Sequence, residues 1–239
     1  MTNLLIDIGN SNCKVAFCNK GELGDIFRSS DSNPAKFILS VIGEKEIGVA
    51  VLSTVREEDL HMQELLKGKC RKLVVLNPSI GLPENFRLGF PATTLGPDRL
   101  AGAFAVSQLF PGRNCIKFDF GTALTVDFIS DEGVFQGGNI SLGMTSRFKA
   151  LNTFTKRLPM ITPGEEVCDF GTATAEAIES GVVLGMKFEV EGYIDKYPGH
   201  AVIFTGGDSF YFAEKLKSPI FVIPNLVLVG LALIAEYYV

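Results

Sequence analysis

Histidine is scarce in this 239-residue chain, and the cysteines do not fall into pairs. The two histidines, His61 and His200, lack the spacing of metal ligands, so we do not expect a histidine-based zinc site. The five cysteines form an odd number with no Cys-x-x-Cys spacing, which is not typical of a disulfide framework. The N-terminus has no basic segment followed by an apolar signal core. These absences predict a protein of the reducing cytoplasm.

The chain also lacks a long unbroken apolar run and an excess of basic residues. Its most apolar stretch, residues 219–235, is interrupted by Pro224 and Asn225 and weakened by Gly230. We therefore expect a buried strand followed by a helix there, and no membrane span. The net charge of −5 and the pI near 5.2 disfavour nucleic acid or an anionic membrane as a partner. A composition of 46% hydrophobic and 21% charged residues indicates an ordinary folded protein.

Two familiar nucleotide-binding signatures are missing. The sequence has no Gly-x-x-x-x-Gly-Lys-Ser/Thr segment, which excludes a Walker-type site. Residues 119–121 spell the Asp-Phe-Gly tripeptide of protein kinases, but neither the glycine-rich loop nor the His-Arg-Asp catalytic loop accompanies it. A protein kinase is therefore excluded.

What the chain does contain is a strand–turn–strand unit that occurs twice. In the first copy, a strand at residues 3–8 enters a polar turn at Asp7-Ile-Gly9, and a second strand begins at Lys14. The second copy begins 112 residues later, at Asp119, between strands at 114–118 and 124–129. This recurrence predicts two related subdomains, residues 1–112 and 113–239, with a cleft between them.

Helices and strands alternate around these turns. We expect helices at residues 35–41, 57–66, 99–109 and 173–178, and further strands at residues 47–53, 72–76 and 201–204. The alternation indicates an α/β fold. Glycine-rich loops are expected at residues 133–143 and 205–208, where a nucleotide's sugar and base could lie or where tight packing could require glycine.

The two turns suggest phosphate binding. Glycine lets the backbone approach a phosphate, and successive N–H groups with a Ser or Thr hydroxyl can bind its oxygens. From their positions, Asp7 and Asp119 could each hold Mg²⁺, directly or through water, or a monovalent cation. The alternative is a simple Asx-turn in each hairpin, but the duplication favours phosphate binding and an ATP-dependent small-molecule kinase. A third Asp-x-Gly, at Asp169, lacks the hairpin context, so we discount it.

Between the two turns, residues 96–99 (Gly-Pro-Asp-Arg) lead from a loop into a helix. A carboxylate there can orient or accept the proton of an attacking hydroxyl, and a guanidinium can bind a carboxylate or phosphate. Asp98 and Arg99 fit these two roles. Equally, Asp98 could be an N-terminal helix cap and Arg99 an ordinary surface residue.

The order of these motifs resembles the type III pantothenate kinases, which belong to the actin-like, sugar-kinase and Hsp70 ATPase superfamily. The resemblance spans nearly the whole chain. It is carried by residues 7–14, 96–99, 119–127, 137–140 and 205–207. It implies two actin-like, ribonuclease H-like subdomains with an ATP cleft, and phosphorylation of pantothenate to 4′-phosphopantothenate, the first step of coenzyme A biosynthesis.

The same resemblance implies roles for individual residues. The ATP contacts would be Asp7, Ile8, Gly9, Asn10, Ser11, Asn12, Cys13, Lys14 and Thr122. Pantothenate would meet Gly96, Pro97, Asp98, Arg99 and Thr174, the last from the neighbouring subunit's side of a homodimer. Asp98 would be the proton acceptor. Asp119 would hold a monovalent cation, K⁺ or NH₄⁺, and Mg²⁺ would accompany ATP.

Some positions depart from the family pattern. Ser11 stands where threonine is usual and keeps the hydroxyl, and Leu142 replaces a common proline. Gly89 occupies the place of a tyrosine that lines the pantothenate site, which Phe90 could replace after a one-residue shift.

Two other functions are alternatives: a non-catalytic regulator on the same scaffold, which the Bvg accessory factor relatives suggest, and a kinase for another small alcohol.

Overall fold

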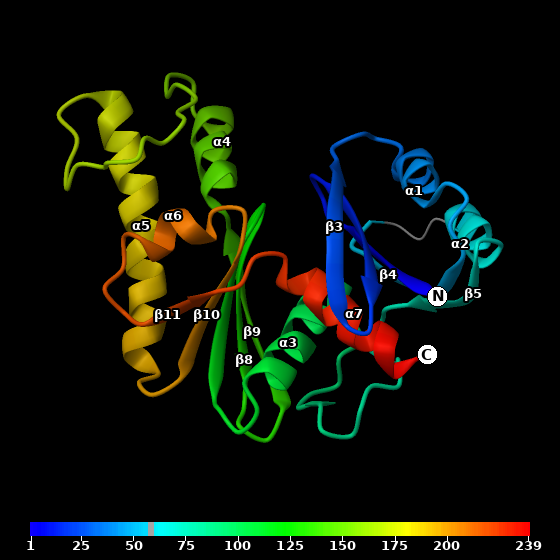
Figure 1. Ribbon diagram of the computed structural model, residues 1–239. Coiled ribbons are helices and arrows are strands. Elements are labelled where there is room, and N and C mark those ends of the chain that lie inside the picture. The colour runs from blue at the N-terminus through cyan, green and yellow to red at the C-terminus, as the bar shows by residue number, and fades with distance from the viewer. Residues whose placement is uncertain (57–59) are drawn as a thin grey trace. The chain divides into compact units, whose positions relative to one another are not determined.

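A computed structural model describes residues 1–56 and 60–239, which form two compact units (Figure 1). The first unit contains residues 1–112, 130–136 and 225–239, and the second contains residues 113–129 and 137–224. The chain therefore divides after Gly112, and strand β9 (Val134–Leu142) begins in the first unit and ends in the second. Among the described helices, none has both the length and the apolar character needed to cross a bilayer.

The first unit is built on a five-stranded sheet with the order β3-β2-β1-β4-β5. The strands β1, β2 and β3 are antiparallel neighbours, while β1, β4 and β5 run parallel. Besides the start of β9, its strands and helices are β1 (Thr2–Ile8), β2 (Cys13–Asn19), β3 (Glu22–Ser29), α1 (Pro34–Ile42), β4 (Ile47–Thr54), α2 (Leu60–Lys67), β5 (Cys70–Val75), β6 (Arg87–Leu88), α3 (Pro97–Leu109) and α7 (Leu226–Tyr237).

The core of this unit forms because alternate residues of β1 face opposite sides of the sheet. Leu4, Ile6 and Ile8 pack in one cluster with apolar residues of α1 and α2, such as Ile38 and Leu66. Helix α7 contacts β1, β4 and α3. It approaches α3 so closely that a Cβ added to Gly230 would lie 2.1 Å from the carbonyl oxygen of Ala101. Small residues at this crossing therefore let the two helix backbones meet.

The second unit repeats the arrangement of the first. Its strands and helices, with the later part of β9, are β7 (Cys115–Phe120), β8 (Ala123–Ile129), α4 (Met144–Phe154), α5 (Thr174–Lys196), β10 (Ala201–Gly206), α6 (Ser209–Ala213) and β11 (Ile220–Val222). The second sheet has the order β11-β10-β7-β8-β9-β6. Read from β9 to β11, it follows the third-second-first-fourth-fifth order of the first sheet, with an antiparallel β7–β8 hairpin and parallel β7, β10 and β11. The duplicated α/β fold predicted from the two turns is confirmed.

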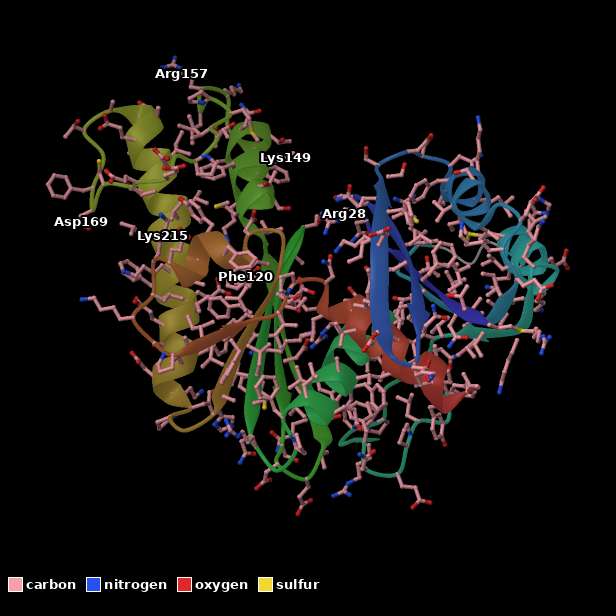
Figure 2. All side chains as sticks on the ribbon, in the orientation of Figure 1. Arg28, Phe120, Lys149, Arg157, Asp169 and Lys215 are labelled. Carbon is pink, nitrogen blue, oxygen red and sulfur yellow. The ribbon has the colours of Figure 1, made fainter. Side chains whose placement is uncertain are left out.

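An aromatic cluster forms the core of the second unit. Phe118 and Phe120 on β7 pack against Phe204 on β10, with ring centroids 5.3 and 4.7 Å away, and Phe120 stacks on Phe212 of α6 at 5.0 Å. All four side chains are buried. Figure 2 shows Phe120 inside this unit, whereas Asp169 lies on an outer loop near α5. The third Asp-x-Gly, as expected, is not part of a hairpin.

Some sequence-based expectations were wrong or differ at their edges. Residues 134–142 form a strand and not a loop, because Gly133 makes the tight turn (φ +73°) and Val134 and Phe135 then pair with β6. The helix expected at 173–178 continues to Lys196, since its apolar face joins the core through residues such as Val183 and Met186. Helix α2 is confirmed from Leu60, whereas residues 57–59 lie outside the described residues.

The observed units also differ from the predicted subdomain ranges. The division after Gly112 coincides with the predicted one. However, residues 130–136 and 225–239, which were expected in the second subdomain, belong to the first unit. Residues 225–239 do so because α7 packs on α3, β1 and β4. The strand at 220–222 and the following helix at 226–237 agree with the interpretation of the most apolar stretch.

Candidate active site

The first turn joins β1 and β2 at the edge where β1 ends. Asp7 lies in register with Lys14 on β2 and Ser53 on β4, and the Ser53 hydroxyl donates a hydrogen bond to Asp7 Oδ1 over 3.4 Å. The Gly9 N–H donates to the Asn12 carbonyl over 2.9 Å and closes the turn. The turn is thus closed by its own backbone, and a hydroxyl group from β4 binds its carboxylate.

The residues expected to contact ATP differ in how they face solvent. Asn10, Ser11 and Asn12 are exposed. Ile8 and Cys13 are buried in the core, so any contact that these two make with a ligand would come from their backbone. Burial, with a smaller effect of Asp7, raises the pKa of the Cys13 thiol to about 11.

Arg56, just after β4, holds the first turn from the side. Its Nε donates to the Gly9 carbonyl over 3.0 Å and its Nη2 to the Asn10 carbonyl over 3.3 Å. The Arg56 N–H donates to the Thr54 hydroxyl over 3.2 Å. Sequence reasoning missed this residue, because a single arginine 46 positions after Asn10 belongs to no local motif.

The second turn repeats the first on β7 and β8. Asp119 lies in register with Thr125 on β8 and Thr205 on β10, and the Gly121 N–H donates to the Ala123 carbonyl over 3.0 Å. Among the described atoms, Thr125 Oγ1 is buried without a hydrogen-bond partner. A carboxylate and two hydroxyl-bearing side chains thus share one register position.

Two glycines let other segments press against this second turn. Gly206 has φ +94°, and a Cβ there would lie 2.6 Å from Asp119 Oδ1 and 2.5 Å from the Phe120 nitrogen. A Cβ at Gly143 would lie 2.0 Å from the Gly121 carbonyl oxygen. Close approach therefore requires glycine at both positions. Of the two interpretations of the glycine-rich segments, tight packing applies to Gly143 and Gly206.

Helix α4 begins beside the second turn. The Thr122 carbonyl accepts hydrogen bonds from the Gly143 N–H over 3.1 Å and from the Ser146 hydroxyl over 2.6 Å. Thr122 itself is exposed. The N-terminal end of α4, which carries a partial positive charge, therefore lies close to the expected ATP contact at Thr122.

Asp98 lies in the first turn of α3, which has Gly96 as its N-cap residue and Pro97 at its first position. Asp98 Oδ1 accepts a hydrogen bond from the Arg99 N–H over 2.8 Å. A Cβ at Gly96 would lie 2.6 Å from the same oxygen, so only glycine leaves room for the carboxylate in this orientation. The aspartate is held by its own helix, but it is not the N-cap that the plainer interpretation proposed.

Arg99 and Phe90 both pack on Phe135. The Arg99 guanidinium carbon lies 5.8 Å from the Phe135 ring centroid, and the Phe90 ring lies 5.7 Å away in an edge-to-face arrangement. A Cβ at Gly89 would meet Val134 Cγ1 at 3.1 Å and the Phe135 carbonyl oxygen at 3.2 Å, which is too close for a tyrosine without local movement. The ring in contact with the Gly-Pro-Asp-Arg segment is therefore Phe135, and Phe90 is a neighbour of that ring.

Thr174 begins α5 and faces a hollow within the second unit. The hollow has a volume of about 700 Å³. Its lining is mostly apolar and includes Arg147, which forms an ion pair with Glu189. The lining residues are Leu142, Arg147, Ala150, Leu151, Leu158, Thr174, Ala177, Ile178, Gly181 and Val182.

Two further charged features lie in the second unit. Lys117 Nζ and Asp127 Oδ2 form an ion pair at 2.8 Å, and both side chains are almost fully buried. Burial raises the pKa of Asp208, which follows the Thr205-Gly206-Gly207 segment. No group of three or more His, Cys, Asp or Glu side chains with the arrangement of a metal site occurs in residues 1–56 and 60–239.

The candidate site residues therefore gather in separate sets. In the first unit, the structure brings Arg56 and Ser53 to the first turn, and brings both Arg99 and Phe90 to the Phe135 ring. In the second unit, it brings Gly143 and Gly206 to the turn at Asp119. Thr174 belongs to neither set and lines the hollow.

Comparison with known proteins gives a consistent family. A model described as type III pantothenate kinase matches residues 3–196. A type III pantothenate kinase from Phocaeicola vulgatus is 42% identical over 241 residues, which cover 98% of this chain and 98% of the relative. Another, from Porphyromonas gingivalis, is 37% identical over 245 residues, covering 99% of each chain.

Solved structures share the fold at lower sequence identity. A structure described as a Baf family transcriptional activator from Campylobacter jejuni has a TM-score of 0.66 and 24% identity, and covers 98% of both chains. A structure described as a 2-dehydro-3-deoxygalactonokinase from Sinorhizobium meliloti has a TM-score of 0.63 and 14% identity, and covers 99% of both chains. These similarities agree with the actin-like, sugar-kinase fold of the two units.

Proposed function

The chain belongs to the type III pantothenate kinase family, and from this premise we propose that it transfers the γ-phosphoryl group of ATP to the primary hydroxyl of pantothenate. The products are ADP and 4′-phosphopantothenate, and the reaction is the first step of coenzyme A biosynthesis. The near full-length similarity to relatives with this name carries the proposal. No specific observation favours a regulator or a kinase for another alcohol.

Asp98 acts as the proton acceptor. Asp98 Oδ1 is already engaged by the Arg99 N–H, so the second carboxylate oxygen receives the proton of the pantothenate hydroxyl. The hydroxyl oxygen forms a bond to the γ-phosphorus as the bond to the bridging oxygen of ADP breaks. The other residues of this segment, Gly96, Pro97 and Arg99, bind pantothenate. Phe90, which packs on the same Phe135 ring as Arg99, takes the place of the family's tyrosine.

The two turns bind ATP. The first turn, from Asp7 to Lys14, surrounds the phosphates, and Thr122 adds a contact from the second turn. When bound, Mg²⁺ neutralises the phosphate charge and so favours transfer. Asp7, whose carboxylate accepts from Ser53, is the residue of the first turn with the chemistry to hold this ion, directly or through water.

Asp119 fits a monovalent cation, K⁺ or NH₄⁺. Its carboxylate shares a register position with Thr125 and Thr205. The buried Thr125 Oγ1 has no hydrogen-bond partner among the described atoms, so this oxygen can serve as a cation ligand. Hard cations prefer such oxygen donors.

We place the enzyme in the cytoplasm as a homodimer. The dimer rests on the family resemblance. Three large apolar side chains of the second unit, Ile140, Leu142 and Phe188, are exposed and so are available to a second copy of the chain. Thr174 then contacts pantothenate from the neighbouring subunit's side. Sedimentation equilibrium of the purified chain tests the dimer, which a monomeric mass would contradict.

The activity is tested by ADP release from ATP and Mg²⁺, with and without K⁺, against a panel of small alcohols. Pantothenate should give the strongest signal, and a signal equal to background would reject the function. Asp98→Asn should lower kcat by about 10²–10⁴-fold, the range for losing one acid–base group, while the KM for ATP stays near the wild-type value. Unchanged turnover would remove Asp98 from its role.

A further inference from the structure

Arg56 makes an unusual pair of contacts for a side chain outside every motif. Two nitrogens of one guanidinium bind the carbonyls of consecutive residues, Gly9 and Asn10, over 3.0 and 3.3 Å. These carbonyls belong to the turn whose own closing bond runs from the Gly9 N–H to the Asn12 carbonyl. The side chain is partly buried, and its backbone is tied to Thr54. Arg56 is therefore held both by its guanidinium and by its backbone N–H.

Together with the geometry of the peptide bond, these contacts determine the direction of two N–H groups in the turn. A trans peptide is planar, and its C=O and N–H point in opposite directions. The carbonyl of Gly9 shares a peptide with the N–H of Asn10, and the carbonyl of Asn10 shares one with the N–H of Ser11. Because both carbonyls point toward one guanidinium, both N–H groups point away from it, toward the opposite side of the turn.

Two successive N–H groups directed to one side form the kind of concave anion site that binds phosphate. Resting on the proposed function, in which the first turn binds ATP, we propose that Arg56 is a positioning residue that orients the N–H groups of Asn10 and Ser11 toward an ATP phosphate. Arg56 lies on the carbonyl side of the turn and does not itself touch the phosphate. Its fork geometry matters more than its charge, since one guanidinium must bind two carbonyls at once.

The experiment measures ATP binding by calorimetry and steady-state kinetics for Arg56→Gln, Arg56→Ala and Arg56→Lys. Arg71→Gln is the matched control, because Arg71 is an exposed residue of β5, in the same unit, with no place in the site. Arg56→Gln and Arg56→Ala should bind ATP about tenfold more weakly, equal to about 1.4 kcal/mol. Their KM for pantothenate should stay within about twofold of wild type, since the change disturbs only the turn that binds ATP.

Arg56→Lys separates geometry from charge. A lysine keeps the positive charge but replaces the planar fork by a single ammonium, so it should lose most of the ATP affinity that Arg56→Gln loses. Wild-type affinity in Arg56→Lys would show that charge suffices and would overturn the positioning role. Unchanged ATP binding in Arg56→Gln, or equal increases in both KM values, would overturn it too.

Two further measurements keep the outcomes distinct. Thermal melting of each variant, followed by circular dichroism, shows whether it folds. If Arg56→Gln and Arg56→Ala do not fold, Arg56→Lys alone tests the proposal. Wild-type protein that fails to bind ATP at all would reject the proposed function, and the role of Arg56 with it. Wild-type binding together with unaltered variants would reject only the role of Arg56.

Discussion

Replacing Lys117 by methionine is expected to lower the free energy of unfolding by about 3–5 kcal/mol. The ion pair between Lys117 Nζ and Asp127 Oδ2 spans 2.8 Å, and the side chains are 1% and 0% exposed. The two residues face each other in register on the β7–β8 hairpin. Methionine preserves most of the side-chain volume, so the change removes a charge and leaves a buried carboxylate without its partner.

The magnitude follows from two opposing terms. With an effective dielectric constant of about 20, unit charges 2.8 Å apart attract by about 6 kcal/mol. Removing both ions from water costs several kcal/mol each, so the intact pair contributes little net stability. Replacing both residues together should therefore change the free energy of unfolding very little. We expect Lys117→Met with Asp127→Leu to change stability by less than about 1 kcal/mol, or to increase it.

The assay is equilibrium denaturation in urea, followed by far-ultraviolet circular dichroism because the chain has no tryptophan. Wild type, both single variants and the double variant form a double-mutant cycle. Lys187→Met is a control, since Lys187 forms a pair with Glu191 at 3.7 Å whose side chains are 29% and 36% exposed. This change should cost under about 1 kcal/mol. A cost below 1 kcal/mol for Lys117→Met, or a double variant as unstable as the two singles added together, would refute the reasoning.

Two other predictions concern close packing and buried thiols. Gly206→Ala should lower the melting temperature far more than Gly199→Ala: both glycines have positive φ, which costs alanine about 1–2 kcal/mol, but only Gly206 has backbone atoms within 2.5 Å of the added Cβ. Equal shifts would contradict this. Burial raises the pKa of Cys13, Cys18 and Cys115 from 9.0 to about 11. The unfolded chain thus loses thiol protons first, so unfolding free energy should fall as pH rises from 9 toward 11. At pH 8 a thiol reagent should label exposed Cys168 fastest, and rapid labelling of all five cysteines would contradict the burial.

Much of the fold could be predicted because its signals are local. Apolar runs that end in Asp-x-Gly turns predict a strand–turn–strand hairpin without knowledge of distant residues. The repetition of this unit at Asp119 then predicts a duplicated α/β architecture. The local signals failed where glycine is compatible with both a loop and a strand. The glycines at 137 and 138 suggested a loop, but β9 runs through them because it is hydrogen-bonded to β8 as well as to β6.

By itself, the sequence determined the two turns, the Gly-Pro-Asp-Arg segment and the family, since each depends on neighbouring residues in a fixed order. Only the tertiary structure decided which distant residues support them. It brought Arg56 to the carbonyls of Gly9 and Asn10, and Phe135 to the ring of Phe90. It also joined α7 to the first unit. These contacts link segments dozens to more than a hundred residues apart, and no local pattern encodes a partner at that distance.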